Sequence, residues 1–307
     1  MPNPFKAMLI AALLLGGCAT RLSNHAAVPA ALGAPVSEAA MLESLARPGV
    51  VTLETFAVAE WHFPNTIRDP GATDWRTRQL DAQIFVYAMV HPRQGLFLID
   101  AGLPADYQSR LGPVLRGVTQ NDYGLVLRTP TETLLAGRPG PRGVFITHLH
   151  YDHMLGVAAL DPATPLYLGP GDGRQISLFH HVIGPPIDNA LRGRGPVREW
   201  RFEAPEPGRL AIVDIFGDGS VFAIHTPGHT PGSTAYLVNT PTGAHLMTGD
   251  AVHSRDGWTG LYEEAAGFEA DIPQIQASLS ALRILAAKVP GLTVHPGHQS
   301  LTDRAAD

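Results

Sequence analysis

The stretch THLHYDHMLG, Thr147 to Gly156, gathers three histidines and an aspartate into six consecutive positions. It directly follows the apolar run GVFI at residues 143–146, which has the length and composition of a short buried strand. The metal-capable side chains are those of His148, His150, Asp152 and His153. A single histidine is more often structural than a ligand, but four such side chains at this spacing indicate a metal site.

The local pattern also predicts where these side chains lie. A strand at residues 143–146 and a helix over residues 153–160 would place them on the connecting loop, where alternate residues can converge. Imidazole and carboxylate groups suit Zn²⁺ and other divalent first-row metals. The set contains no cysteine, which disfavours a purely structural zinc site.

Three further candidates occur downstream, each after a β-rich run. His229 lies between two Pro-Gly turns in HTPGHTPGS, Asp250 ends the strand-like LMTGD, and His298 follows in VHPGHQS. Strand ends of this kind can gather along one edge of a layered sheet. Seven ligands are enough for two metals if one carboxylate bridges them.

In this order the motifs resemble those of the metallo-β-lactamase superfamily, whose THxHxDH signature is followed by a later histidine, a Gly-Asp pair and a final histidine. The resemblance covers roughly residues 50–300. It implies an α/β fold, the αββα sandwich, in which two mixed β-sheets face each other and helices flank them. It also implies two divalent metal ions, with Zn²⁺ expected: one held by His148, His150 and His229, the other by Asp152, His153 and His298, with Asp250 bridging.

Two other positions can be compared with the family pattern. Asp100, in LFLIDAG, matches the strand-end aspartate of the family, which implies that it orients a ligand without binding the metal itself. Leu155 and Gly156 stand where the family usually has two glycines. This departure removes no ligand.

The expected reaction is hydrolysis, because two divalent ions that share a hydroxide lower its pKa and polarise the group that it attacks. β-Lactamases with the same signature generally lack the bridging aspartate, so Asp250 favours the lactonase, thioesterase and phosphodiester-hydrolase branches. The spacing of His229, Asp250 and His298 is most similar to that of N-acyl-homoserine lactonases. The expected partner is a small lactone or ester, opened by a metal-bridging hydroxide.

Enzymes of the lactonase branch typically carry a tyrosine three residues after the bridging aspartate, where this chain has His253. An imidazole can donate a similar hydrogen bond, so the resemblance implies catalytic roles for His253, for Asp250 and for Asp152 as a proton shuttle. The replacement leaves open a β-lactamase or a phosphoester or organophosphate hydrolase on the same site. A non-catalytic, lipid-anchored binding protein is a further alternative, whose mark would be a missing ligand.

Composition narrows the function classes. The chain has 307 residues, of which 45% are hydrophobic and 16% charged, as in an ordinary globular protein. Its net charge of −6 offers no clustered basic surface, so no nucleic-acid partner is expected. We expect one hydrolase domain over residues 49–307. The Gly-, Pro- and Arg-rich insertion at residues 172–209 is long for a plain connection and predicts a lid.

The N-terminal residues 1–18 have a short region with one lysine and an apolar run at residues 7–15 that is too short to span a bilayer. Their ending, LGGC, resembles the lipobox of bacterial lipoproteins, and Cys18 is the only cysteine in the chain. We therefore expect a signal peptide, export, and a lipid anchor on Cys18. Ala19 is not the aspartate of inner-membrane retention, which favours the outer membrane, facing the periplasm. Residues 19–48 are expected to form a tether.

Overall fold

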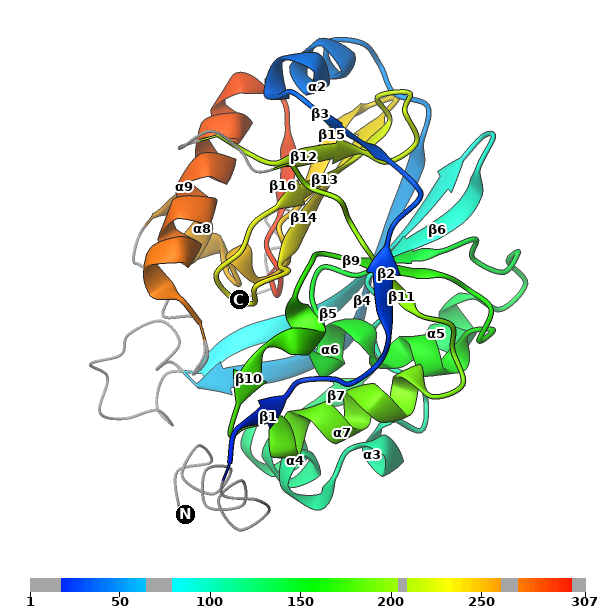
Figure 1. Ribbon diagram of the computed structural model, residues 1–307, viewed down its shortest axis with the longest axis vertical. Helices are drawn as coiled ribbons and strands as arrows, with labels where there is room; N and C mark the ends of the chain where they lie inside the picture. The colour runs from blue at the N-terminus through cyan, green and yellow to red at the C-terminus, as the bar shows by residue number, and fades with distance from the viewer. Residues whose placement is uncertain (1–17, 65–78, 204–208, 261–269, 300–307) are drawn as a thin grey trace.

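A computed structural model describes residues 18–64, 79–203, 209–260 and 270–299 of the chain. Two large mixed sheets dominate the described residues (Figure 1). The first has eight strands in the order β2-β11-β9-β8-β6-β5-β4-β7. These strands are β2 (Ala27–Pro29), β4 (Thr52–Pro64), β5 (Gln79–His91), β6 (Gly95–Ile99), β7 (Val126–Leu127), β8 (Val144–Phe145), β9 (Leu166–Leu168) and β11 (Val197–Glu199).

The second large sheet has six strands in the order β16-β15-β14-β13-β12-β3. They are β3 (Ala34–Val36), β12 (Ile212–Asp214), β13 (Val221–His225), β14 (Thr234–Thr240), β15 (Gly243–Met247) and β16 (Thr293–His295). Among its described strands, only β15 and β16 pair in parallel. A small antiparallel pair joins β1 (Thr20–Arg21) to β10 (Ile176–Ser177).

Strand β5 shows how the space between the sheets is filled. Ile84 and Val86 belong to one hydrophobic cluster, whereas Phe85, Tyr87 and Met89 belong to another. Successive side chains of a strand point to opposite faces of the sheet, so β5 is buried on both sides. The cluster around Tyr87 continues into the six-stranded sheet through Val213, Val221, Ala223, Tyr236, Val238 and Met247. This cluster is the core between the two sheets.

The helices of the described residues are α2 (Glu38–Leu45), α3 (Tyr107–Arg110), α4 (Pro113–Gly117), α5 (Thr131–Leu134), α6 (Tyr151–Met154), α7 (His180–Leu191), α8 (Arg255–Thr259) and α9 (Ile272–Lys288). Shorter helical turns are η2 (Val118–Asp122), η3 (Leu155–Ala159), η4 (Asp172–Arg174) and η5 (Gly249–Ala251).

Helices cover the outer face of each large sheet. Leu282 and Leu285 of α9 pack on the six-stranded sheet, where Met41 of α2 joins the same cluster. Ile187 and Leu191 of α7 belong to the cluster on the outer face of the eight-stranded sheet. The order of layers is helix, sheet, sheet, helix, which confirms the predicted αββα sandwich (Figure 1).

The predicted tether at residues 19–48 is corrected by the structure. Strands β1, β2 and β3 pair with β10, β11 and β12, and α2 packs in the core through Met41. Each of these strands is only two or three residues long, so no alternating pattern marks it in the sequence. The N-terminal segment is therefore part of the folded body.

The insertion at residues 172–209, which the sequence predicts to be a lid, is also part of the fold where the structure describes it. Its strand β11 pairs in parallel with β9 and β2, and α7 buries Val182, Ile187 and Leu191. Residues 204–208 lie outside the described residues.

Residues 1–17 of the predicted signal peptide also lie outside the described residues, and Cys18 is exposed. None of the helices that the structure describes combines the length and apolar character needed to cross a membrane.

The departure from the family pattern at Leu155 and Gly156 has a clear structural setting. Leu155 is fully buried, and the backbone N–H of Gly156 donates to the carbonyl of Gly102 at 2.8 Å. A Cβ atom at position 156 would lie 1.9 Å from the carbonyl oxygen of Ala101. The second of the two positions therefore requires glycine, whereas the first accepts a large apolar side chain.

Candidate metal centre

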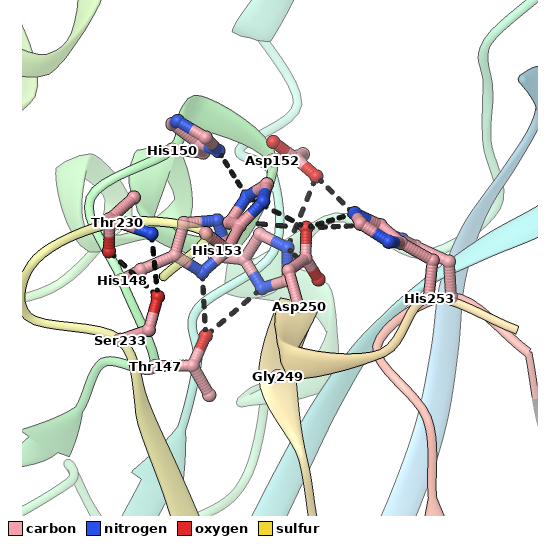
Figure 2. Close-up of polar contacts among 12 residues, drawn as sticks. Thr147, His148, His150, Asp152, His153, Thr230, Ser233, Gly249, Asp250 and His253 are labelled. Carbon is pink, nitrogen blue, oxygen red and sulfur yellow. Dashed lines mark hydrogen bonds and ion pairs between the residues drawn. The ribbon is translucent and has the colours of Figure 1, made fainter. Parts of the chain in front are cut away.

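All seven predicted ligands come together in one place. Figure 2 shows five of them, His148, His150, Asp152, His153 and Asp250, grouped around the carboxylate of Asp250. The loop after β8 and the start of α6 carry four of them, and the turn between β13 and β14 carries a fifth. The sixth lies in η5 after β15, and the seventh follows β16. Ends of four strands thus bring together His148, His150, Asp152, His153, His229, Asp250 and His298.

The ligands form two groups in which the donor atoms lie within 4.8 Å of one another. The first donor group consists of His148, His150 and His229 together with Asp250. The second donor group consists of Asp152, His153 and His298. This partition is the one that the family resemblance implies.

Asp250 lies between the two groups. Its Oδ2 is 3.3 Å from Nε2 of His229 in the first group and 3.3 Å from Nε2 of His298 in the second. Its Oδ1 is 3.4 Å from Nε2 of His153. One carboxylate therefore contacts both groups, as a bridging ligand would.

The residues present fit two cations. Buried polar atoms normally have a hydrogen-bond partner. Among the described residues, His148 Nε2, His153 Nε2 and Asp250 Oδ1 are buried without one. These atoms face the shared centre, and imidazole nitrogens with carboxylate oxygens are ligands that divalent metals accept.

The electrostatic environment of the first donor group favours the metal-binding protonation states. Burial and the neighbouring histidines hold the pKa values of His148 and His229 well below the ordinary range, so both imidazoles are neutral. Burial alone would raise the pKa of Asp250, but the surrounding imidazoles, that of His298 first, outweigh it and lower the pKa. Neutral imidazoles beside an ionised carboxylate are the forms that bind cations.

In the second group, burial alone would lower the pKa of His153, but the carboxylates of Asp250, Asp152 and Asp100 outweigh it and raise the pKa well above the ordinary range. His153 must therefore release a proton to bind a metal.

Asp100 contacts His153 of the second donor group on the ring nitrogen that does not face the centre. Its carboxylate accepts hydrogen bonds from Thr147, through the backbone N–H at 2.7 Å and the hydroxyl at 2.9 Å, and lies 2.8 Å from Nδ1 of His153. An Nδ1–H that donates to Asp100 leaves the Nε2 lone pair of His153 for a metal. Asp100 also has a left-handed φ of 55°, which aspartate tolerates better than most residues. The structure thus places it where the resemblance implies.

His298 is held in a comparable way by Gln83. Its Nδ1 lies 2.8 Å from the backbone carbonyl of Gln83, and the His298 N–H donates to the carbonyl of His253. No sequence pattern points to Gln83, because its contribution is a backbone carbonyl that any residue could supply.

His253 lies inside the centre. Its side chain is buried, and its Nε2 is 3.3 Å from Oδ2 of Asp250 (Figure 2). The imidazole also stacks on that of His298, with ring centroids 5.8 Å apart and planes 12° apart. The residue that replaces the expected tyrosine therefore points its imidazole at the bridging carboxylate.

The sequence profile of the metallo-beta-lactamase superfamily matches residues 81–298, which include all seven predicted ligands. The chain belongs to the metallo-β-lactamase superfamily. Among its relatives in that superfamily, it is 39% identical to the N-acyl homoserine lactonase AttM of Azorhizobium caulinodans over 229 residues, which are 69% of this chain and 80% of AttM. It is 29% identical to the metallo-hydrolase mfmC of Annulohypoxylon moriforme over 189 residues, 57% of this chain and 49% of mfmC.

The fold of the present chain is also similar to that of AidC, a dizinc quorum-quenching lactonase solved with a product, N-hexanoyl-L-homoserine. The TM-score is 0.53 at 16% identity, over 89% of this chain and 95% of AidC. The chain spans about half of mfmC but most of AttM and AidC. The superfamily match, the similarity to AttM and the two donor groups together identify the chain as a metal-dependent hydrolase that is similar to the lactonase branch.

Proposed function

We propose that the chain opens lactone rings such as those of N-acyl-homoserine lactones, or cleaves closely related esters. The observation that carries this proposal is the contact of one carboxylate, Asp250, with both donor groups. The 39% identity to a protein named N-acyl homoserine lactonase supports the choice of substrate class.

In this proposal His148, His150 and His229 would hold one ion, Asp152, His153 and His298 would hold the other, and Asp250 would be the ligand that they share. Zn²⁺ is the proposed ion, because it accepts both imidazole and carboxylate ligands. The two ions supply a water-derived nucleophile near neutral pH and polarise the carbonyl that it attacks.

The residues of the chain complete the reaction. The Nε2–H of His253 donates a hydrogen bond to the carbonyl oxygen as negative charge develops there. Water adds to the carbonyl carbon, the ring C–O bond breaks, and a proton passes through the Asp152 carboxylate to the departing ring oxygen, which yields a hydroxy acid. Asp152 is buried, and although burial alone would raise its pKa, His153 and His298 lower it, so it is ionised and able to accept that proton.

A substrate panel on the purified, zinc-loaded protein tests this function. We expect acyl-homoserine lactones or simple esters to be hydrolysed faster than nitrocefin, a carbapenem, a thioester, a phosphodiester and an organophosphate. The His253→Tyr variant, which restores the residue expected of the lactonase branch, should keep or raise lactone turnover. Efficient cleavage of the β-lactams with lactones and esters untouched would replace the lactonase assignment with a β-lactamase, and preference for the organophosphate would replace it with a phosphotriester hydrolase.

A further inference from the structure

A buried carboxylate outside the two donor groups connects the two chain segments that carry the first group. Asp172 is the first residue of η4, after β9, and its side chain is fully buried. Its Oδ2 accepts the backbone N–H of Leu149 at 3.0 Å, and its Oδ1 accepts the backbone N–H of Gly232 at 2.5 Å.

Both amides belong to ligand-bearing segments. Leu149 lies between His148 and His150 on the loop after β8. Gly232 lies three residues after His229 on the turn between β13 and β14. One carboxylate thus joins the loop that carries two imidazoles of the first donor group to the turn that carries the third.

The turn itself is organised around the same carboxylate. The hydroxyl of Thr230 interacts with Asp172, and Thr230 Oγ1 lies 2.8 Å from Oγ of Ser233, beside the histidines of the centre (Figure 2). A Cβ atom on Gly232 would lie 2.5 Å from Asp172 Oδ1, so a glycine allows the turn to approach this closely. These contacts fix the position of the turn relative to Asp172.

The second donor group is supported by other residues, namely Asp100 behind His153 and the Gln83 carbonyl behind His298. The hydrogen bonds that Asp172 accepts among the described residues come from Leu149, Thr230 and Gly232, and none of these residues belongs to that group. We propose that Asp172 is a positioning residue that sets the metal affinity of the first donor group alone, by holding the Leu149 loop and the His229 turn at a fixed separation. This inference rests on the proposed metal ligands.

A matched control exists elsewhere in the molecule. Asp214 is also a buried carboxylate, and it accepts the backbone N–H groups of Gly217 and Gly219, both at 2.9 Å. Those amides lie in the loop before β13, at the opposite end of that strand from the His229 turn. Asp214→Asn therefore removes the same kind of contact away from the first donor group.

The test is a titration of the metal-free full chain with Zn²⁺ against a chromophoric chelator, which resolves two dissociation constants. Burial raises the pKa of Asp172 to about 6. The buffer is therefore held at about pH 8, where this carboxylate is ionised. For Asp172→Asn we expect one dissociation constant to rise about 10–100-fold and the other to stay unchanged. Asp214→Asn should change neither.

Two further variants make the result decisive. In a His298→Ala background, which weakens the second group, adding Asp172→Asn should still weaken the remaining tight site. Asp172→Glu keeps the charge but has a side chain that is one methylene longer, so it should show the same selective loss of metal affinity in the first donor group. This variant replaces Asp172→Asn in the test if Asp172→Asn does not fold. Equal weakening of both sites, or an effect no larger than that of Asp214→Asn, would overturn the inference. A wild-type chain that binds fewer than two ions would instead overturn the proposed metal ligands.

Discussion

The two donor groups use similar side chains, but the protein holds them differently. In the second group, the Nδ1 atoms of His153 and His298 lie 2.8 Å from fixed acceptors, a carboxylate and a backbone carbonyl. When Nε2 binds a metal, these contacts hold the remaining ring proton on Nδ1.

In the first group, the imidazoles contact one another. His150 Nδ1 and His229 Nε2 lie 3.0 Å apart, and His229 Nδ1 is buried with no hydrogen-bond partner in the described part of the chain. His148 has a longer contact of 3.2 Å, from Nδ1 to the hydroxyl of Thr147. Acceptors on the Nδ1 atoms, one a carboxylate and one a backbone carbonyl, therefore orient the second group, whereas the first depends on backbone placement of its loop and turn.

The largest effect should come from the residue that the two groups share. Asp250→Asn removes the charge that contacts both groups, so we expect weaker binding of both ions and a loss in lactone hydrolysis on the order of 10²-fold or more. Elemental analysis and initial rates would measure this. If two ions remain bound and activity stays within about tenfold of wild type, Asp250 does not bridge.

A smaller and more selective effect is expected from replacement of Asp100, which contacts the second group. Asp100→Asn leaves the left-handed backbone intact, since asparagine tolerates that conformation. It removes the carboxylate that holds His153, so the second ion should bind about 10–100-fold more weakly while the first is unaffected. Zinc titration of this variant beside Asp172→Asn should show opposite sites weakened. Loss at the same site in both variants would abolish the distinction between the groups.

The sequence was most informative where a side chain carries the chemistry itself. Every predicted ligand follows a strand, and strand ends meet at one edge, so the motifs alone located His148, His229, Asp250 and their partners. The same pattern could not reveal Asp172, because GPGDG resembles an ordinary turn and the carboxylate acts on amides 23 and 60 residues away.

The N-terminal strands escaped prediction for a related reason. β2 is three residues long and ends in proline, and its partner β11 lies far along the chain. Such pairing depends on contacts distant in sequence, which local periodicity does not encode.

A histidine pair outside the donor groups offers a way to separate proton effects from metal effects. His245 Nδ1 and His295 Nε2 lie 3.0 Å apart across β15 and β16, with rings stacked at 5.3 Å. His295 is buried against the edge of the Tyr87 ring. Burial, with a smaller contribution from His245, lowers the pKa of His295 to about 4.

The smallest predicted effect follows from this pair. In the unfolded chain His295 titrates near pH 6.5, so as the pH falls the unfolded chain gains a proton that the folded chain, with a pKa of about 4, does not. The contribution of His295 to the free energy of unfolding is therefore fully present above about pH 6.5 and is lost as the pH falls towards 4. Between pH 7.5 and 5.5 the free energy of unfolding should decrease by about 1 kcal/mol for this reason. In His295→Gln this part of the pH dependence should vanish, because glutamine does not titrate. The metal ligands are the same in both proteins, so their titration cancels in the comparison, whatever the absolute stability of the variant. His245→Gln should also reduce the pH dependence, because it removes the smaller cause of the His295 shift and a second imidazole whose own pKa is lowered by burial. Urea unfolding of the zinc-loaded proteins at the two pH values measures the difference, and equal pH dependence in wild type and His295→Gln would contradict the contribution of His295.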